Sequence, residues 1–191
     1  MSDEFLYHID RNWTLFLDRD GVINHETEGE YVTQWSEFKF YDGVKQALEI
    51  FAQKFNRIII ITNQRGVSKG LMDEGDLRDI HLNMLGAIEA AGGRIDRIYY
   101  CIDMNDDSMN RKPNPGMALQ AKKDFPEIDF KRSLMIGNTM ADMQFGRNIG
   151  AHTIFISSNR PVPSMPNALV DAAYPSLIAV AARLSSHTTH R

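Results

Sequence analysis

Short apolar runs alternate along the chain with segments whose apolar residues recur every three or four positions. The runs are rich in β-branched and aromatic residues and predict five strands, at residues 13–17, 57–62, 95–102, 133–137 and 153–156. The periodic segments predict helices at residues 43–55, 73–91, 115–125, from 138 onward and 176–184. Strands that alternate with helices in this way predict an α/β fold with a mostly parallel central sheet.

Polar segments separate these elements. Residues 25–41 are polar with interspersed aromatics and predict a long loop, and residues 103–110 and 157–167 predict two more. The last seven residues, 185–191, form a polar tail that we expect to be disordered. No internal repeat, low-complexity tract or linker divides the sequence, so residues 1–191 predict a single domain.

Composition excludes several classes of partner. Of 191 residues, 43% are hydrophobic and 24% charged, which is ordinary for a globular protein. The formal net charge of −4 argues against nucleic acid and against anionic membranes, and no apolar run approaches the roughly 18 residues of a membrane span. The start, M-S-D-E-F, lacks a signal-peptide pattern, and one cysteine, Cys101, cannot form an internal disulfide. These features predict a cytoplasmic protein.

Polar side chains follow four of the predicted strands. They are Asp18 and Asp20; Thr62, Asn63 and Gln64; Arg111 and Lys112, reached through a loop; and Asn138 with Asp142. The carboxyl ends of parallel strands meet at one edge of the sheet, where such folds place their ligands. We therefore expect these clusters to converge on one active site, although paired acids beside a glycine are also typical of a solvated turn.

The four clusters carry motifs that resemble those of the haloacid dehalogenase (HAD) superfamily. The motifs read F-L-D-R-D-G-V-I-N, I-T-N-Q, R-K-P-N-P-G-M and M-I-G-N-T-M-A-D, in order along residues 13–157. Within the superfamily the sequence is most similar to D-glycero-D-manno-heptose 1,7-bisphosphate phosphatases and the related histidinol-phosphate phosphatases. The resemblance implies a three-layer, Rossmann-like fold. No sizeable helical insertion interrupts the motifs, so we expect a capless, open site.

The resemblance also implies roles for individual residues. Asp18 would attack phosphorus and form an aspartyl phosphate, while Asp20 would act as general acid and then as general base. Thr62 and Lys112 would hold the oxygens of the transferring phosphoryl group. The positions that match substrate contacts of the family, or lie beside them, are Asn63, Gln64, Arg65, Arg111 and Thr139.

A magnesium ion is implied as the cofactor. Its ligands would be the Asp18 carboxylate, the Asp20 backbone carbonyl and a side chain of the fourth motif, Asn138 or Asp142. Asn138 stands where the family usually has aspartate, so the site loses one negative charge. We expect weaker Mg²⁺ binding as a result, and we expect Asn138→Asp to lower the Mg²⁺ concentration needed for half-maximal activity.

A second departure concerns zinc. Many relatives carry three cysteines and a histidine in the loop before R-K-P. Here Cys101 stands at the first position, Asp103 replaces the histidine, and the rest of the loop is shortened. A single cysteine cannot assemble a closed thiolate site, so we expect no structural zinc.

Several of these residues have structural alternatives. Thr62 could cap its strand, Lys112 could be a solvated loop lysine, and Arg65 and Arg111 could be ordinary surface arginines. His81 lies on the apolar face of a predicted helix, where a satisfied, half-buried histidine is commoner than a ligand.

The leading functional hypothesis is a Mg²⁺-dependent phosphomonoesterase that acts on a small phosphorylated metabolite, in particular the heptose bisphosphate. Histidinol phosphate is the alternative substrate. Arg65 and Arg111 would suit the second phosphate of the bisphosphate. The cationic amine of histidinol phosphate would instead suit the acids Asp103, Asp106 and Asp107. A noncatalytic phosphosugar-binding protein is the alternative from another class, and the net charge argues against a polynucleotide 3′-phosphatase. We expect a monomer or a weak homo-oligomer.

Overall fold

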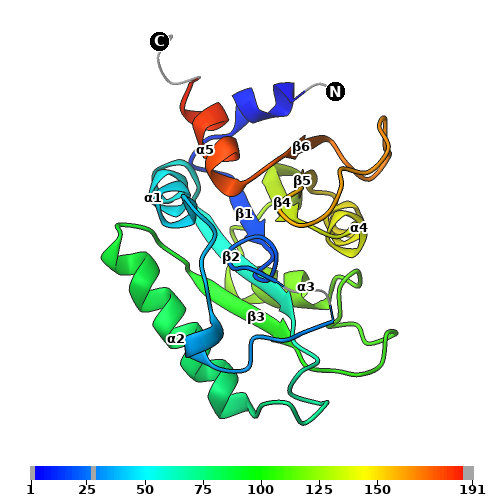
Figure 1. Ribbon diagram of the computed structural model, residues 1–191. Coiled ribbons are helices and arrows are strands. Elements are labelled where there is room, and N and C mark those ends of the chain that lie inside the picture. Colours follow the sequence, from blue (N-terminus) through cyan, green and yellow to red (C-terminus); the bar gives the residue numbers. More distant parts are fainter. Residues whose placement is uncertain (1–2, 27–28, 187–191) are drawn as a thin grey trace.

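Six parallel strands form the centre of the molecule. The computed structural model describes residues 3–26 and 29–186 (Figure 1). The strands are β1 (Thr14–Leu17), β2 (Arg57–Asn63), β3 (Arg97–Cys101), β4 (Ser133–Gly137), β5 (His152–Ile156) and β6 (Ala172–Tyr174). They lie in the order β3-β2-β1-β4-β5-β6, and every pairing is parallel. Because β1 is central, the segment that follows it emerges in the middle of the sheet edge.

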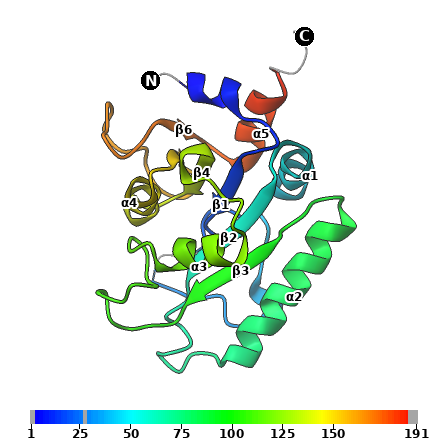
Figure 2. The same ribbon diagram turned by 180° about the vertical axis from the view of Figure 1, so that it is seen from behind.

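Helices cover both faces of the sheet and confirm the three-layer α/β prediction. Helices α1 (Val44–Lys54), α2 (Glu74–Ala90) and α5 (Leu177–Ser185) pack on one face. Helices α3 (Gly116–Asp124) and α4 (Met140–Ile149) pack on the other face. Figure 2 shows the molecule turned by 180° relative to Figure 1. No helix in the described residues has the length and apolarity needed to cross a bilayer.

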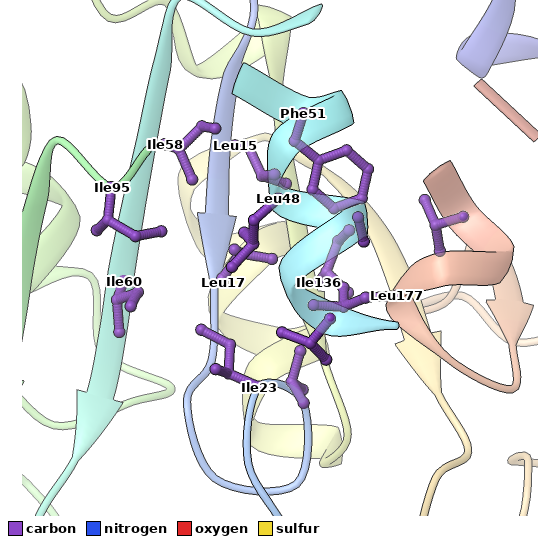
Figure 3. Packing of buried hydrophobic residues seen from close by; sticks show 14 of the residues in the cluster. Leu15, Leu17, Ile23, Leu48, Phe51, Ile58, Ile60, Ile95, Ile136 and Leu177 are labelled. Atoms are coloured by element: carbon purple, nitrogen blue, oxygen red, sulfur yellow. The ribbon is translucent and has the colours of Figure 1, made fainter. Parts of the chain in front are cut away.

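The apolar side chains of β1 alternate between the two helical layers. Leu15 and Leu17 point toward Leu48 and Phe51 of α1 (Figure 3), whereas Phe16 points to the other face and packs edge-on against Phe145 of α4. All of them are fully buried. A strand covered on both faces has no polar side, which explains the continuous apolar run in the sequence.

Three differences from the sequence prediction have a clear physical cause, and the other element ends shift by at most two residues. Strand β3 begins at Arg97 rather than residue 95, because Asp96 occupies the start of the ladder: its carboxylate accepts the Ile58 N–H at 2.7 Å. The short strand β6 was not predicted, since A-A-Y is too brief to stand out. The disordered tail was predicted to begin too early, because α5 extends through Ser185; residues 187–191 lie outside the described part.

The predicted loop at residues 25–41 is mostly irregular. Its described residues, 25–26 and 29–41, include a short 3₁₀ helix, Trp35–Glu37, whose tryptophan stacks on Phe38 at a centroid distance of 5.1 Å. Phe38 is buried in the main core. The interspersed aromatics therefore anchor this loop, which lies across the carboxyl end of the sheet.

Candidate active site

The nucleophile candidate lies where β1 stops. The Asp18 N–H still donates to the Ile136 carbonyl of β4 at 3.0 Å, and the chain then turns, with Gly21 at φ +81°. A side chain at position 21 would be strained at this φ, and its Cβ would overlap the Asn138 amide. The turn thus brings the first motif directly against the fourth.

A buried lysine joins the first, third and fourth motifs. Lys112 Nζ lies 2.8 Å from Asp18 Oδ1 and 2.6 Å from Asp142 Oδ1, and all three side chains are buried. Burial would lower the pKa of Lys112, but the two carboxylates outweigh it and raise that pKa. The lysine is therefore a fixed cation between two acids, not a solvated loop residue.

The pKa of Asp18 is raised above its ordinary value. Burial is the main cause and the nearby Asp142 carboxylate adds to it, while Lys112 offsets only part of the rise. Two carboxylates share one ammonium group here. A further cation close to Asp18 would relieve this imbalance and favour the ionised form that a nucleophile requires.

Asp142 is held in place by the start of α4. Its Oδ2 accepts the backbone N–H of Asn138 at 3.2 Å and of Thr139 at 3.0 Å, and the Thr139 hydroxyl at 2.7 Å. Thr139 in turn caps the helix by accepting the Asp142 N–H. Asp142 therefore orients Lys112, while the predicted substrate contact by Thr139 stays a prediction, since its hydroxyl is engaged in the cap.

Asp20 sits in a different environment from Asp18. Its carboxylate accepts hydrogen bonds from Arg19 at 2.9 Å, from Asn24 at 2.9 Å and from Gln64 at 2.8 Å. Burial would raise the pKa of Asp20, but these donors outweigh it and the pKa is lowered. Gln64 also donates to Thr62 Oγ1 at 2.8 Å, which ties the second motif to the first.

Arg19 is fully buried and links Asp20 to α2. Its Nη1 lies 3.0 Å from His81 Nε2; since arginine can only donate, the histidine accepts and is neutral. Burial and the neighbouring arginine lower the pKa of His81 to about 3. This confirms the structural interpretation of His81. Sequence reasoning missed Arg19 and Asn24 as partners of Asp20, although an arginine between two aspartates was a visible signal.

The remaining predicted substrate residues divide into two groups. Asn63 exchanges hydrogen bonds with the backbone of Lys112, at 3.1 and 3.3 Å, and lies with Gln64 in the wall of a cavity. Arg65 and Arg111 instead both pair with Asp106. Neither arginine is among the residues that line the cavity, so their contact with substrate stays a prediction.

A cavity of about 950 Å³ opens above the two aspartates. Most of its wall comes from the loop at residues 25–41. The lining residues are Asp18, Asp20, His25, Glu26, Gly29, Glu30, Tyr31, Val32, Thr33, Glu37, Lys39, Asn63, Gln64 and Leu71. The cavity is large enough for a phosphorylated metabolite, and the Asp18 carboxylate lies in its wall.

Asn138 has the features of a metal ligand. It is fully buried, and its Oδ1 has no hydrogen-bond partner, although its Nδ2 donates to Glu26 and Asn159. A buried carbonyl oxygen without a partner costs free energy unless a cation or water meets it. Asn138 also abuts the turn at Gly21, one residue from the Asp20 carbonyl. Carboxylate, amide and backbone oxygens are the donor types that Mg²⁺ prefers, so these residues fit that ion.

Nowhere in residues 3–26 and 29–186, the active site included, do three or more His, Cys, Asp or Glu side chains come together as a metal-holding group. Cys101 is buried at the end of β3, and Asp103, which follows it, accepts a hydrogen bond from the Ser108 hydroxyl.

The chain is similar in sequence to known proteins. A family model described as HAD-hydrolase-like matches residues 109–177. A D-glycero-alpha-D-manno-heptose-1,7-bisphosphate 7-phosphatase of Mycobacterium bovis is 31% identical over 166 residues, which are 86% of this chain and 87% of that protein. The enzyme of the same name from Campylobacter jejuni is 37% identical over 142 residues, or 74% of this chain and 80% of that protein.

A solved structure agrees with these sequence matches. The D,D-heptose 1,7-bisphosphate phosphatase of B. bronchiseptica, complexed with magnesium and phosphate, superposes with a TM-score of 0.81 and 26% identity. The match covers 91% of this chain and 98% of the other.

Fold, buried charge cluster and sequence matches together define a phosphoric monoester hydrolase of the haloacid dehalogenase class. The identity to the M. bovis and C. jejuni phosphatases exceeds 30% over most of each compared chain, which assigns the protein to a family within this class. The chain belongs to the family of D-glycero-D-manno-heptose-1,7-bisphosphate 7-phosphatases.

Proposed function

We propose that this enzyme removes the 7-phosphate of D-glycero-D-manno-heptose 1,7-bisphosphate in a Mg²⁺-dependent reaction through an aspartyl phosphate. The observation that carries the proposal is the Asp18–Lys112–Asp142 cluster at the carboxyl ends of the strands, in a chain whose relatives are named for this activity. The roles of single residues below belong to the proposal.

Asp18 is the nucleophile. Its carboxylate attacks phosphorus, an O–P bond forms, and the bond from phosphorus to the sugar oxygen breaks. Lys112 lies within 2.8 Å of this carboxylate and balances the charge of the phosphoryl oxygens, with the Thr62 hydroxyl as a second donor. Asn63 helps to position Lys112 through the backbone of that residue.

Asp20 handles the proton. It donates one to the departing sugar oxygen and then accepts one from the water that hydrolyses the aspartyl phosphate. Arg19, Asn24 and Gln64 hold the resting carboxyl in its ionised form, which suits the second step. For the first step, substrate must weaken some of these contacts so that Asp20 binds a proton.

Mg²⁺ would be held by the Asp18 carboxylate, the Asp20 carbonyl and Asn138 Oδ1, and would neutralise charge on the phosphoryl oxygens. The B. bronchiseptica relative was crystallised with magnesium and phosphate, which supports this choice. Asp142 contributes indirectly, since its oxygens are taken by Lys112 and the start of α4.

The loop at residues 25–41 selects the substrate, because it supplies most of the cavity wall. The lysine of this loop, Lys39, lines the cavity. Its positive charge suits the phosphate of the bisphosphate that is not cleaved. Glu26, Glu30 and Glu37 line the same cavity, and this acidic character supports histidinol phosphate, whose amine is cationic, as the second candidate substrate. The names of the relatives favour the bisphosphate.

Phosphate release tests the proposal. Both anomers of the heptose bisphosphate are assayed with Mg²⁺ beside histidinol phosphate, because some relatives are named for the alpha anomer and others for the beta. We expect the highest kcat/KM with one heptose anomer, and ³¹P NMR should show that the phosphate at carbon 1 remains.

Two variants complete the assay. Asp18→Asn should abolish release, while Asp79→Asn, which removes an exposed carboxylate on α2, should retain it. A higher kcat/KM for histidinol phosphate would replace the substrate assignment. Release that survives in Asp18→Asn, or its absence with every substrate, would contradict the proposed chemistry.

A further inference from the structure

A carboxylate outside the four motifs reaches the buried asparagine of the fourth motif. Glu26, in the loop after β1, accepts a hydrogen bond from Asn138 Nδ2 at 3.2 Å, and its side chain is 24% exposed. It also accepts from Asn159 Nδ2 at 3.1 Å and pairs with Arg160 at 3.5 Å. The glutamate is thus fixed beside the proposed metal position by residues of the loop after β5.

These contacts determine which way the Asn138 amide faces. Glu26 and the Asn159 side-chain carbonyl both accept, at 3.2 and 3.0 Å, and together they use both N–H bonds of Asn138 Nδ2. The opposite rotamer of the amide would set its oxygen against a carboxylate. Glu26 therefore directs Asn138 Oδ1 away from itself, and this is the buried oxygen that has no partner.

Charge supports the same conclusion. Relatives with aspartate at position 138 would supply a carboxylate there, whereas this chain supplies a neutral amide. Glu26 places one negative charge directly behind that amide and lines the same cavity as Asp18 and Asp20. The pair of Asn138 and Glu26 thus carries the charge that a single aspartate would carry.

We propose that Glu26 is a positioning residue for the metal site, which orients the Asn138 amide oxygen toward Mg²⁺ and restores the negative charge missing at position 138. The inference rests on the proposed function in that it assumes Mg²⁺ binds here. It adds a residue to which no motif assigns a role. Side chains that hydrogen-bond a metal ligand typically change metal affinity about 10- to 100-fold when they are replaced.

Titration calorimetry of the metal-free protein with MgCl₂, in the absence of substrate, measures the effect directly. Glu26→Gln should raise the Kd for Mg²⁺ about tenfold. Glu30→Gln is the matched control, because it removes the same charge from the same loop and cavity, and its Kd should stay within about twofold of the parent. Metal-free melting curves establish that each variant folds.

A third variant, Glu26→Gln with Asn138→Asp, exchanges the amide and the carboxylate between the two positions. We expect it to recover most of the lost affinity, because one carboxylate again serves the pair. Equal Kd values for Glu26→Gln and Glu30→Gln would overturn the inference and leave the proposed function intact. A parent protein that binds no Mg²⁺ would overturn both.

Discussion

At the scale of single residues, two aspartates separated by one arginine have opposite electrostatic environments. Asp18 is buried beside Asp142 and its pKa is raised; Asp20 is surrounded by donors and its pKa is lowered. The proposed roles need an ionised Asp18 and a protonated Asp20 at the start. The free protein therefore favours neither of these protonation states. We expect bound metal to lower the pKa of Asp18 and bound substrate to raise the pKa of Asp20.

The raised pKa of Asp18 predicts that its charge weakens the fold. When the pKa of a carboxyl group is higher in the folded than in the unfolded protein, the folded protein loses stability as the pH rises above the ordinary pKa of the group, which is 3.8 for aspartate. Without Mg²⁺, Asp18→Asn should increase the free energy of unfolding by about 1 kcal/mol at pH 8, and by much less at pH 5.

Urea denaturation at both pH values measures this effect. The exposed Asp79→Asn variant serves as the control and should show no such dependence on pH. A destabilised Asp18→Asn protein at pH 8 would mean that the contact with Lys112 outweighs the burial of the charge.

Asn24 adds to the effect of Arg19 in lowering the pKa of Asp20. Its Nδ2 donates to Asp20 Oδ1 at 2.9 Å and helps to lower the pKa of that carboxyl. Asn24→Ala should raise this pKa, so that Asp20 keeps its proton to higher pH. If Asp20 is the general acid, the alkaline limb of kcat/KM against pH should move up by about half a unit or more. An unmoved limb would assign the proton to another group.

At the scale of elements, the start of α4 combines helix capping with the placement of charge. Thr139 and Asp142 form a capping box, and Asp142 uses its other oxygen to hold Lys112. Gly137 is needed just before it, since a Cβ there would overlap the Asp142 carboxylate. Local helix chemistry therefore fixes the lysine that faces the nucleophile.

Removal of the cap should weaken stability and catalysis together. Thr139→Ala should lower the free energy of unfolding by about 1 kcal/mol and should lower kcat, because Asp142 loses a donor and Lys112 loses its fixed partner. Thr139→Ser should restore both. If Thr139 were instead a substrate contact, KM would rise while kcat and the unfolding free energy stayed close to the parent values.

Prediction from sequence succeeded where local pattern decides the element. The continuous apolar run of β1 and the helical spacing of α1 are strong signals, and both elements lie where the sequence placed them. Prediction failed for β6, because the pairing of its three residues with β5 depends on the path of the loop that precedes them. It also began β3 two residues too early, because the side chain of Asp96 occupies the start of that ladder.

At the scale of the whole molecule, parallel topology explains how motifs far apart in sequence form one site. The end-of-strand rule was enough to predict that Asp18, Lys112 and Asp142 converge. The Glu26 contacts were beyond it: they join residues 112 and 133 positions apart, and they depend on how two irregular loops fold over the sheet edge. No periodicity or propensity records such a contact.

The central claim is that the phosphoryl group passes through Asp18, and the covalent intermediate tests it most directly. The Asp20→Asn variant, which should slow hydrolysis of the intermediate, is mixed with the heptose bisphosphate and Mg²⁺, quenched in acid and digested. Mass spectrometry should find one phosphoryl group on the peptide that contains Asp18, and none when Asp18→Asn is added to the variant. Phosphate release without any phosphorylated peptide, or with the label on another residue, would contradict the account.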